Sequence, residues 1–459
     1  MSSFQKCFSA PGKALLAGGY LVLDPANGSF VTALSARIYA FTTPVPANEG
    51  LITVSSPQFK EGEWAYRVKI ATGTGYVTVL PVDSSKSNPF VFSAVHAVLN
   101  YLSASNFLTS PIPALKITIL SDNAYHSQPS GTVTKFNKHS AAINQVPKTG
   151  MGSSAALTTS LTAGLLSFYA GHVVNNKRTL HNLAQLSHCS AQGKIGSGFD
   201  VACAVYGSIQ YNRFQPSIIS SVSGIPELGK EKNYVESIRT VIDSDWGVVT
   251  EPCTIPRRVQ LLMGDVSGGS ETPKLVQLVQ KWRNEIIAKT GSDPQAWTSL
   301  GKANIRLIQL MNKLSTKASQ DSAEYDKTVD KILALKANSQ AIRLLVDGNE
   351  TENLFANVVQ AIVQIRKYLQ QITDESGAQI EPKEQTALLD ACSDLTGVIG
   401  GVVPGAGGYD AICLVVVEEA VDDIKFSKDG VLSKVHWLDL REEDVGLREE
   451  NVEELVKFL

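Results

Sequence analysis

Residues 147–161 read PKTGMGSSAALTTSL, a loop poor in side chains that continues into an apolar run. Gly150 and Gly152 carry no Cβ atom, so a ligand can approach the main chain closely at both positions. The first amide groups of a helix lack partners within the helix and carry a partial positive charge. The stretch therefore predicts an anion site at the start of a buried helix, although an ordinary loop and core helix would produce the same local pattern.

The sequence around this loop lacks carboxylates. Residues 123–199 contain no Asp or Glu, whereas the frequency in the whole chain, 44 in 459, would give about seven over that length. The same stretch supplies the cationic side chains Lys135, Lys138, Lys148, Lys177, Arg178 and Lys194. Such a composition favours a polyphosphate as the ligand.

Two commoner phosphate loops do not fit. The chain has no P-loop motif, which needs Gly, four residues and then Gly-Lys-Ser/Thr. Residues 150–155 match the dinucleotide pattern G-x-G-x-x-G/A, but Asn175 and Asn176 stand where an acidic residue is expected about 20 positions later. Pro147 also lies where the preceding strand should run, so a dinucleotide site is weakly supported.

The composition indicates a globular protein large enough for two domains. The chain has 459 residues, of which 43% are hydrophobic and 19% charged, and its net charge of −3 argues against a nucleic-acid partner. No apolar run reaches about 18 residues and the first residues lack an apolar signal core, so we expect no membrane span and a cytoplasmic location. The six cysteines form no C-x-x-C pair, which argues against disulfides and zinc. His181 and His188 are interpreted as ordinary helix residues.

Hydrophobic periodicity predicts a mixture of strands and helices. Strands are expected at residues 31–41, 51–54, 64–70, 75–80, 115–120 and 261–266. Helices are expected at residues 89–102, 179–192, 274–287, 304–345, 354–372 and 386–395. Residues 398–417 predict strand, glycine loop and strand, and the polar stretch 215–245 predicts a domain boundary.

Three further segments carry candidate functional residues. Residues 8–23 predict a Pro-Gly turn and a strand entering a tight loop, in which Lys13 either points outward to solvent or binds a phosphate. Asp200 follows a glycine loop and opens an apolar helix, where it is either the helix N-cap or a carboxylate brought to a phosphate-binding cleft. Residues 267–276, SGGSETPKLV, predict another anion site at a helix start.

Three glycine motifs occur together in this chain: PGKALLAGGY at 11–20, the loop at 147–156, and PGAGGYD at 404–410. In this order and at these separations they resemble the GHMP kinases, the superfamily of galacto-, homoserine, mevalonate and phosphomevalonate kinases. The segments DNAYHSQ, AQGKIGSGFDVA and GGSETPKLVQ further resemble the fungal-type phosphomevalonate kinase family. The resemblance implies an α+β fold of two domains. These are an N-terminal α/β domain over residues 1–225, with a left-handed-type βαβ nucleotide site, and a C-terminal ferredoxin-like domain over residues 226–459.

The resemblance also implies an activity. It is ATP-dependent phosphoryl transfer to the phosphate of (R)-5-phosphomevalonate, giving 5-diphosphomevalonate and ADP, in the mevalonate route to isoprenoids and sterols. ATP and Mg²⁺ are the expected cofactors. The sequence does not determine the oligomeric state, and we expect a monomer by default. The alternatives are mevalonate kinase or another small-molecule GHMP kinase, a decarboxylase of the same fold, and a non-catalytic sensor of ATP and a metabolite.

The resemblance assigns roles to individual residues. Lys13 and Asp200 are expected to be catalytic, and Ser154 to bind Mg²⁺. ATP is expected at Lys148, Thr149, Gly150, Met151, Gly152, Ser153, Ser154 and Ala155. The acceptor is expected at Gly19, Tyr20, His126, Lys194, Ser197, Ser270, Thr272, Lys274, Gly405, Ala406 and Gly407. In one departure, the magnesium-binding glutamate of mevalonate kinase-like members is missing, and Cys189 lies in its neighbourhood.

The chemistry of the acceptor bears on the role of Asp200. An alcohol must lose a proton as it attacks, which suits a carboxylate base. A phosphate monoester has a second pKa of about 6 and is mostly a dianion at neutral pH, so it needs no base. Cations and backbone amides are then expected to carry the catalysis, and Asp200 acts either as a base or by holding Lys13 in place.

Overall fold

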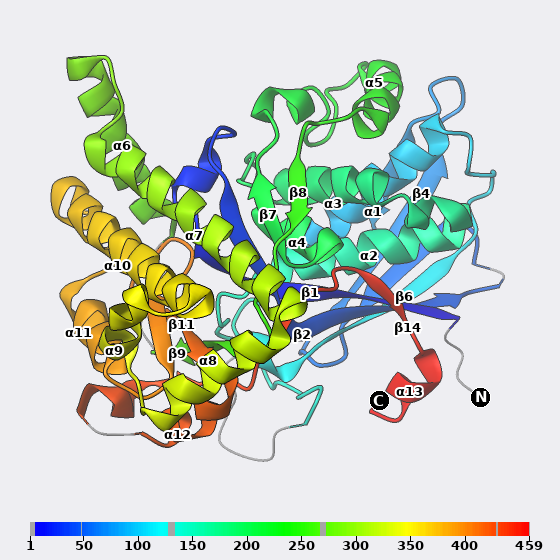
Figure 1. Ribbon diagram of the computed structural model, residues 1–459. Helices are drawn as coiled ribbons and strands as arrows, with labels where there is room; N and C mark the ends of the chain where they lie inside the picture. The colour runs from blue at the N-terminus through cyan, green and yellow to red at the C-terminus, as the bar shows by residue number, and fades with distance from the viewer. Residues whose placement is uncertain (1–4, 47, 127–133, 267–271, 428–429, 459) are drawn as a thin grey trace.

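The computed structural model describes residues 5–46, 48–126, 134–266, 272–427 and 430–458 (Figure 1). Its larger sheet has the strand order β14-β1-β2-β6-β3-β4-β5, with β7, β8 and β13 attached alongside. The central strands are β1 (Lys6–Ala17), β2 (Ser29–Pro44), β6 (Leu115–Ser121), β3 (Leu51–Ser55), β4 (Glu63–Ile70) and β5 (Val77–Pro81). β1 and β2 are buried along almost their whole length, which is why they appear in the sequence as continuous apolar runs.

A bulge on the partner strand β2 stands where the sequence predicts a Pro-Gly turn in β1: Pro11 pairs with Arg37 and Gly12 with Leu34, so Ser35 and Ala36 of β2 have no partner in β1. The register between β1 and β2 shifts between Pro11 and Gly12, and the strand continues beyond it to Ala17. Lys13 follows this irregularity directly, and it is the one charged residue between Phe8 and Leu23.

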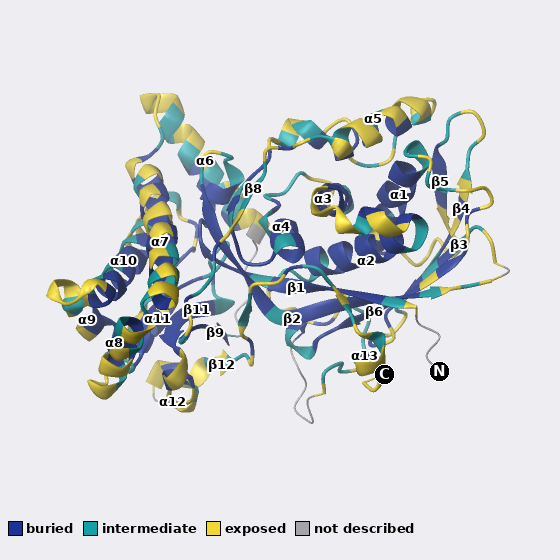
Figure 2. Cartoon of the chain, turned by 45° about the vertical axis from the view of Figure 1, so that its right-hand side comes forward, coloured by how far each residue is buried: buried dark blue, intermediate teal, exposed yellow. Residues whose placement is uncertain are grey.

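Five helices lie on one side of the larger sheet (Figure 2). They are α1 (Pro89–Ala104), α2 (Ser153–Ala170), α3 (Lys177–Gln192), α4 (Phe199–Tyr206) and α5 (Glu231–Asp243). α2 packs against β1, β2, α1 and α3 and is buried continuously from Ala155 to Ser167. The glycine loop therefore leads into a helix in the middle of the domain, as the sequence predicts.

The second sheet is antiparallel, with the order β10-β11-β9-β12. Its strands are β9 (Val259–Asp265), β10 (Val398–Val402), β11 (Ala411–Val417) and β12 (His436–Trp437), and its helices are α6 (Thr272–Thr290), α7 (Gln295–Gln320), α8 (Ser322–Ala334), α9 (Ser339–Arg343), α10 (Glu350–Ser376), α11 (Lys383–Ser393) and α12 (Val421–Phe426). The single helix expected at 304–345 is wrong. It is divided at Asp321, whose side chain accepts a hydrogen bond from Glu324 N and caps α8, and again at Lys336, which has φ +47°. The predicted α+β class is confirmed.

Strand pairing bears on the domain boundary. α5 packs against α1 and α3, and β8 (Val249–Pro252) pairs with β7 (Ile209–Asn212) of the larger sheet. The next strand, β9, belongs to the second sheet. The division after residue 225 stays a prediction, while the pairing favours a later crossing, between Pro252 and Val259.

The last strands return to the larger sheet. β13 (Glu442–Glu443) pairs with β2, and β14 (Arg448–Glu450) pairs with β1. Arg37 of β2 is only 1% exposed and its guanidinium binds the carboxylate of Glu443, while its Nε donates to Ser9 Oγ at 2.7 Å. This ion pair, in which the arginine is buried and the glutamate is 25% exposed, fixes residues 442–450 on the larger sheet.

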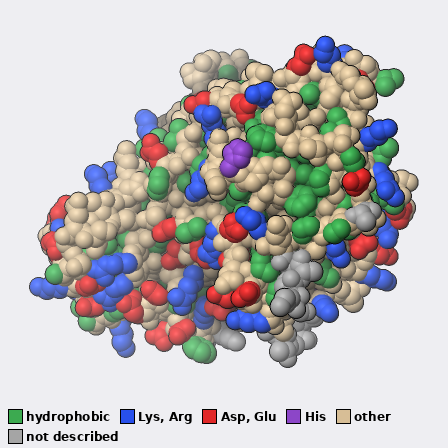
Figure 3. Space-filling view, turned by 90° about the vertical axis from the view of Figure 1, so that its right-hand side faces the viewer, with side chains coloured by type: hydrophobic (Ala, Val, Ile, Leu, Met, Phe, Trp, Pro, Cys, Tyr) green, Lys and Arg blue, Asp and Glu red, His purple; other side chains and the backbone are tan. Residues whose placement is uncertain are grey.

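Charged groups are mixed on the surface shown in Figure 3, where Lys and Arg side chains alternate with Asp and Glu. No helix within the described ranges is long and apolar enough to cross a membrane. The expected lack of a nucleic-acid partner and the cytoplasmic location stay predictions.

Replacing Arg37 by Met should lower the free energy of unfolding by about 3–5 kcal/mol, because the change removes a guanidinium that is 1% exposed and leaves the Glu443 carboxylate with only Arg448, at 3.6 Å. Lys6→Met is a matched control, since Lys6 lies 3.3 Å from Glu449 in a pair whose side chains are 41% and 52% exposed. That exposed pair should contribute less than about 1 kcal/mol. Urea denaturation followed by circular dichroism measures both variants, and equal losses would contradict the assignment.

Candidate active site

A cavity of about 320 Å³ lies where the two sheets meet. β1, the glycine loop and α4 line it from one side, and β9, β11, α6 and the 404–407 turn line it from the other. The predicted site residues that line this cavity are Lys13, Tyr20, Thr149, Gly150, Gly152, Ser197, Asp200, Gly405, Ala406 and Gly407. The three glycine motifs, far apart in the sequence, therefore share one cavity.

Lys13 is joined to the glycine loop by its backbone and by its side chain. Its amide donates to Met151 O at 3.0 Å, and its Nζ donates to Gly150 O at 2.9 Å. The Nζ also lies 5.5 Å from the centre of the Phe199 ring. Burial lowers the pKa of Lys13 from its usual value, and the neighbouring Asp200 opposes this effect. The side chain thus points into the cavity and not outward to solvent.

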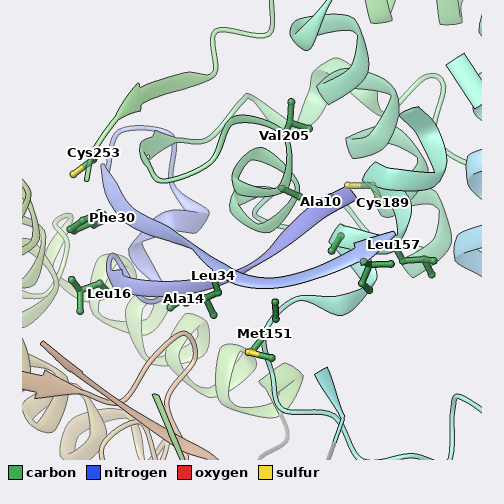
Figure 4. Close-up of a cluster of buried hydrophobic side chains, with 14 of the residues drawn as sticks. Ala10, Ala14, Leu16, Phe30, Leu34, Met151, Leu157, Cys189, Val205 and Cys253 are labelled. Carbon is green, nitrogen blue, oxygen red and sulfur yellow. The ribbon is translucent and has the colours of Figure 1, made fainter. Parts of the chain in front are cut away.

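Gly152 occupies the N-cap position of α2 with φ +78°, a conformation that side chains rarely adopt. A Cβ atom added there would lie 3.2 Å from Lys13 Cγ and 3.3 Å from Lys13 Cε. Met151, just before it, packs in the hydrophobic cluster that includes Ala14 and Leu34 (Figure 4). The backbone of the loop is therefore fixed by the packing of Met151 in the hydrophobic core and by its close contact with the Lys13 side chain.

The turns of the two domains touch beside this cavity. Tyr20 OH donates to Ala406 O at 2.5 Å. A Cβ atom on Gly19 would lie 2.7 Å from Gly405 O, so Gly19 contributes close backbone packing and does not line the cavity. These contacts hold the 404–407 turn against the loop that follows β1.

Asp200 lies in the first turn of α4, with one oxygen accepting from Val201 N at 3.0 Å. Gly198 is the N-cap of that helix, so the alternative that Asp200 caps it is wrong. The other oxygen of Asp200 is 3.9 Å from His188 Nε2. Burial lowers the pKa of His188, while the Asp200 carboxylate opposes this effect.

A larger cavity of about 480 Å³ lies on the other side of the glycine loop. Lys148, Ser153 and Ser154 line it, and so does His126, which the sequence analysis grouped with the acceptor. Burial, with His139 and Lys148 nearby, lowers the pKa of His126 to about 4. Residues that the sequence analysis missed also line this cavity, among them Lys60, Trp64, Ser85, Lys86, Asn88 and Phe90. The Asn88-Pro89 pair signals the start of α1, but nothing local marks the loop before it as a ligand site.

Ala155, Lys194 and Lys274 line neither cavity. Ala155 is buried, and its amide donates to Gly152 O at 3.1 Å. Lys194 and Lys274 are exposed. Thr272 is the first residue of α6, and Ser270 lies outside the described residues. Asp410, part of the third glycine motif but not among the predicted site residues, lines the smaller cavity.

Few protein groups are available to bind a metal ion. Within the described residues no group of three or more His, Cys, Asp and Glu side chains could hold one. Ser154 Oγ and the Asp200 carboxylate lie on either side of His188, at 3.0 Å and 3.9 Å from its Nε2. Mg²⁺ at phosphoryl-transfer sites takes one or two protein ligands, with substrate phosphates and water completing its shell. The residues present therefore fit Mg²⁺ bound together with a nucleotide.

Comparison with known proteins gives the class and then the family. Residues 114–208 match the family model of the GHMP kinases N terminal domain. The phosphomevalonate kinase of Candida albicans is 41% identical over 465 residues, covering 98% of this chain and 99% of that protein. The phosphomevalonate kinase of Gibberella zeae is 36% identical over 90% of this chain and 87% of its own. The chain belongs to the phosphomevalonate kinase family.

A solved structure shares the fold. It is the phosphomevalonate kinase of Streptococcus pneumoniae in complex with phosphomevalonate and AMPPNP, with a TM-score of 0.58 and 14% sequence identity. The match covers 96% of this chain and all of the other, so the two-domain architecture extends over the whole protein.

Gly152→Ala should displace Lys13 and lower kcat/KM for ATP by about 10- to 100-fold, because a small misplacement at the reacting centre has a large effect on rate. Gly150→Ala is the matched control. Gly150 has φ +75°, so it carries a similar backbone strain, but a Cβ there would meet no atom within 4 Å. Steady-state kinetics and thermal melting should therefore show similar losses of stability and a much larger loss of activity for Gly152→Ala. Equal losses of activity would contradict the contact with Lys13.

Proposed function

We propose that this protein transfers the γ-phosphoryl group of ATP to the phosphate of (R)-5-phosphomevalonate, giving 5-diphosphomevalonate and ADP. Two cavities that meet at residues 148–154, in a chain of the phosphomevalonate kinase family, carry this proposal. The S. pneumoniae neighbour, solved with both phosphomevalonate and AMPPNP, supports the same pair of ligands. In this chain the two ligands would approach one another from opposite sides of the glycine loop.

The larger cavity suits the nucleoside of ATP. Trp64 and Phe90 supply apolar rings, and Lys60, Lys86 and Lys148 supply positive charge. The triphosphate would then follow the glycine loop to the start of α2, where helix amide groups favour an anion. The smaller cavity, with Lys13 and Asp200, would hold the acceptor and the phosphoryl group in transit.

The reaction requires two anions to meet. An oxygen of the acceptor phosphate forms a bond to the γ-phosphorus, and the bond from that phosphorus to the bridging oxygen of ADP breaks. Because the acceptor is already a dianion, no proton has to leave it. The main barrier is electrostatic, and Lys13 is placed to lower it as charge develops on the transferring group. Mg²⁺, which Ser154 would hold together with ATP oxygens, neutralises phosphate charge when bound.

Asp200 acts in this scheme through Lys13. Desolvation makes the charged form of a buried lysine less stable, and a nearby carboxylate restores it. The Asp200 carboxylate raises the pKa of Lys13 against the effect of burial. We therefore assign Asp200 to keeping Lys13 charged and in place, which is a positioning role.

An acceptor panel tests the activity. ADP release, followed by a coupled assay, should require 5-phosphomevalonate and be at least about 100-fold slower with mevalonate, since an acceptor lacking the phosphate loses a charged, hydrogen-bonded group. Lys13→Met should abolish release with every acceptor if all of them use this site. Faster turnover of mevalonate would favour mevalonate kinase, release of CO₂ would favour a decarboxylase, and ATP binding without any turnover would favour a sensor.

Lys13→Met should reduce kcat at pH 8 more than Asp200→Asn does, because the cation contacts the transferring group and the carboxylate does not. The two losses should be non-additive in the double variant. In Asp200→Asn the alkaline limb of kcat/KM should move to lower pH, since the group that raises the pKa of Lys13 is gone. A pH–rate profile of the three variants measures this. An Asp200→Asn enzyme at least about tenfold slower than Lys13→Met would restore the general-base role.

A further inference from the structure

His188 lies between the two residues to which roles in phosphoryl transfer have been assigned. It belongs to α3 and is 3% exposed, with its ring 5.5 Å from that of Phe90. On one side its Nε2 is 3.0 Å from Ser154 Oγ, at the start of α2. On the other side the same nitrogen is 3.9 Å from Asp200 Oδ2, in the first turn of α4. The starts of two helices thus converge on one ring nitrogen.

The direction of these hydrogen bonds follows from a third neighbour. Gln192 Nε2 lies 3.4 Å from His188 Nε2, and an amide nitrogen can only donate. We assign the proton of the neutral ring to Nδ1, which agrees with this orientation of the Gln192 amide and makes His188 Nε2 an acceptor. With this tautomer Ser154 Oγ, the nearer partner at 3.0 Å, donates its hydrogen bond to this nitrogen. The two lone pairs of the serine oxygen then remain available to a ligand.

This polarity determines what Ser154 can bind. A hydroxyl that donates its hydrogen bond to His188 cannot donate to a phosphate oxygen at the same time. It presents lone pairs to the larger cavity that it lines, which suits a hard cation such as Mg²⁺. Residues that hydrogen-bond to a metal ligand, as His188 does to Ser154, commonly orient that ligand.

We propose that His188 is a positioning residue that accepts the hydrogen bond of the Ser154 hydroxyl and so directs the lone pairs of Ser154 toward a cation at the nucleotide phosphates. The inference rests on the proposed function in that it requires the glycine loop to bind ATP with a divalent cation. It assigns His188 a role that its interpretation as an ordinary helix residue does not include. His181, one of the other buried residues of α3, bonds to Asn182 at 3.1 Å and lines neither cavity.

The test measures how strongly Mg²⁺ tightens nucleotide binding, with no acceptor present. A non-hydrolysable ATP analogue is titrated into the full-length protein by calorimetry, with and without Mg²⁺. The ratio of the dissociation constant without Mg²⁺ to that with Mg²⁺ should fall about tenfold in His188→Leu, as expected for loss of a group that orients a metal ligand. His188→Gln places an amide oxygen where Nε2 stood and should restore most of the ratio. If His188→Leu does not fold, His188→Asn, which is too short to reach Ser154, takes its place.

Two further variants separate a positioning role from general packing. Ser154→Ala should lower the ratio by a similar factor, and adding His188→Leu to it should cause no further loss, because His188 acts through Ser154. His181→Leu removes a buried histidine from the same helix and should leave the ratio unchanged. An unchanged ratio in His188→Leu or in Ser154→Ala, or additive losses in the double variant, overturns the inference. Failure of the acceptor assay with an intact His188 effect would instead count against the proposed function alone.

Discussion

Lys13 connects strand β1 to the glycine loop through two hydrogen bonds, one from its amide to Met151 and one from its ammonium group to Gly150. The loop can follow the lysine so closely because Gly152 adopts a left-handed conformation without a Cβ atom. The same contact places the start of α2 at the boundary between the two cavities. Everything proposed for the site depends on this pairing, since it sets where the phosphates meet the cation.

Electrostatics explains why the surroundings of this pairing are so poor in acids. Two phosphorylated ligands carry several negative charges between them, and each nearby carboxylate would raise the cost of bringing them together. Asp200 is tolerated because it lies beside Lys13 and offsets the loss of solvent around that ammonium group. The neutral polar groups near it, Ser154 and His188, form hydrogen bonds without adding negative charge. Asp200 is thus placed where it supports a cation, while Asp410 also lines the smaller cavity and Glu61 lines the larger one.

The sequence predicted those features that depend on short segments. The glycine loop, the helix after it and most strands were recovered, because turn residues and apolar runs act locally. The helix at 304–345 was not, since its apolar period continues across Asp321 while the side chain of that residue caps a new helix. The larger cavity and the role of His188 could not be predicted, because both arise from the convergence of separate elements. Periodicity places His188 on a helix face, but the two helix starts that meet there are known only from tertiary structure.

The return of β13 and β14 to the larger sheet has a consequence for biosynthesis. A ribosome synthesises β1 and β2 first, yet Arg37 must wait for Glu443, which is made 406 residues later. Its guanidinium stays hydrated while the whole second sheet is translated. The larger sheet is therefore completed only after the second sheet has been translated, and a nonsense codon before position 443 would remove the counter-ion of Arg37 together with every residue downstream of it.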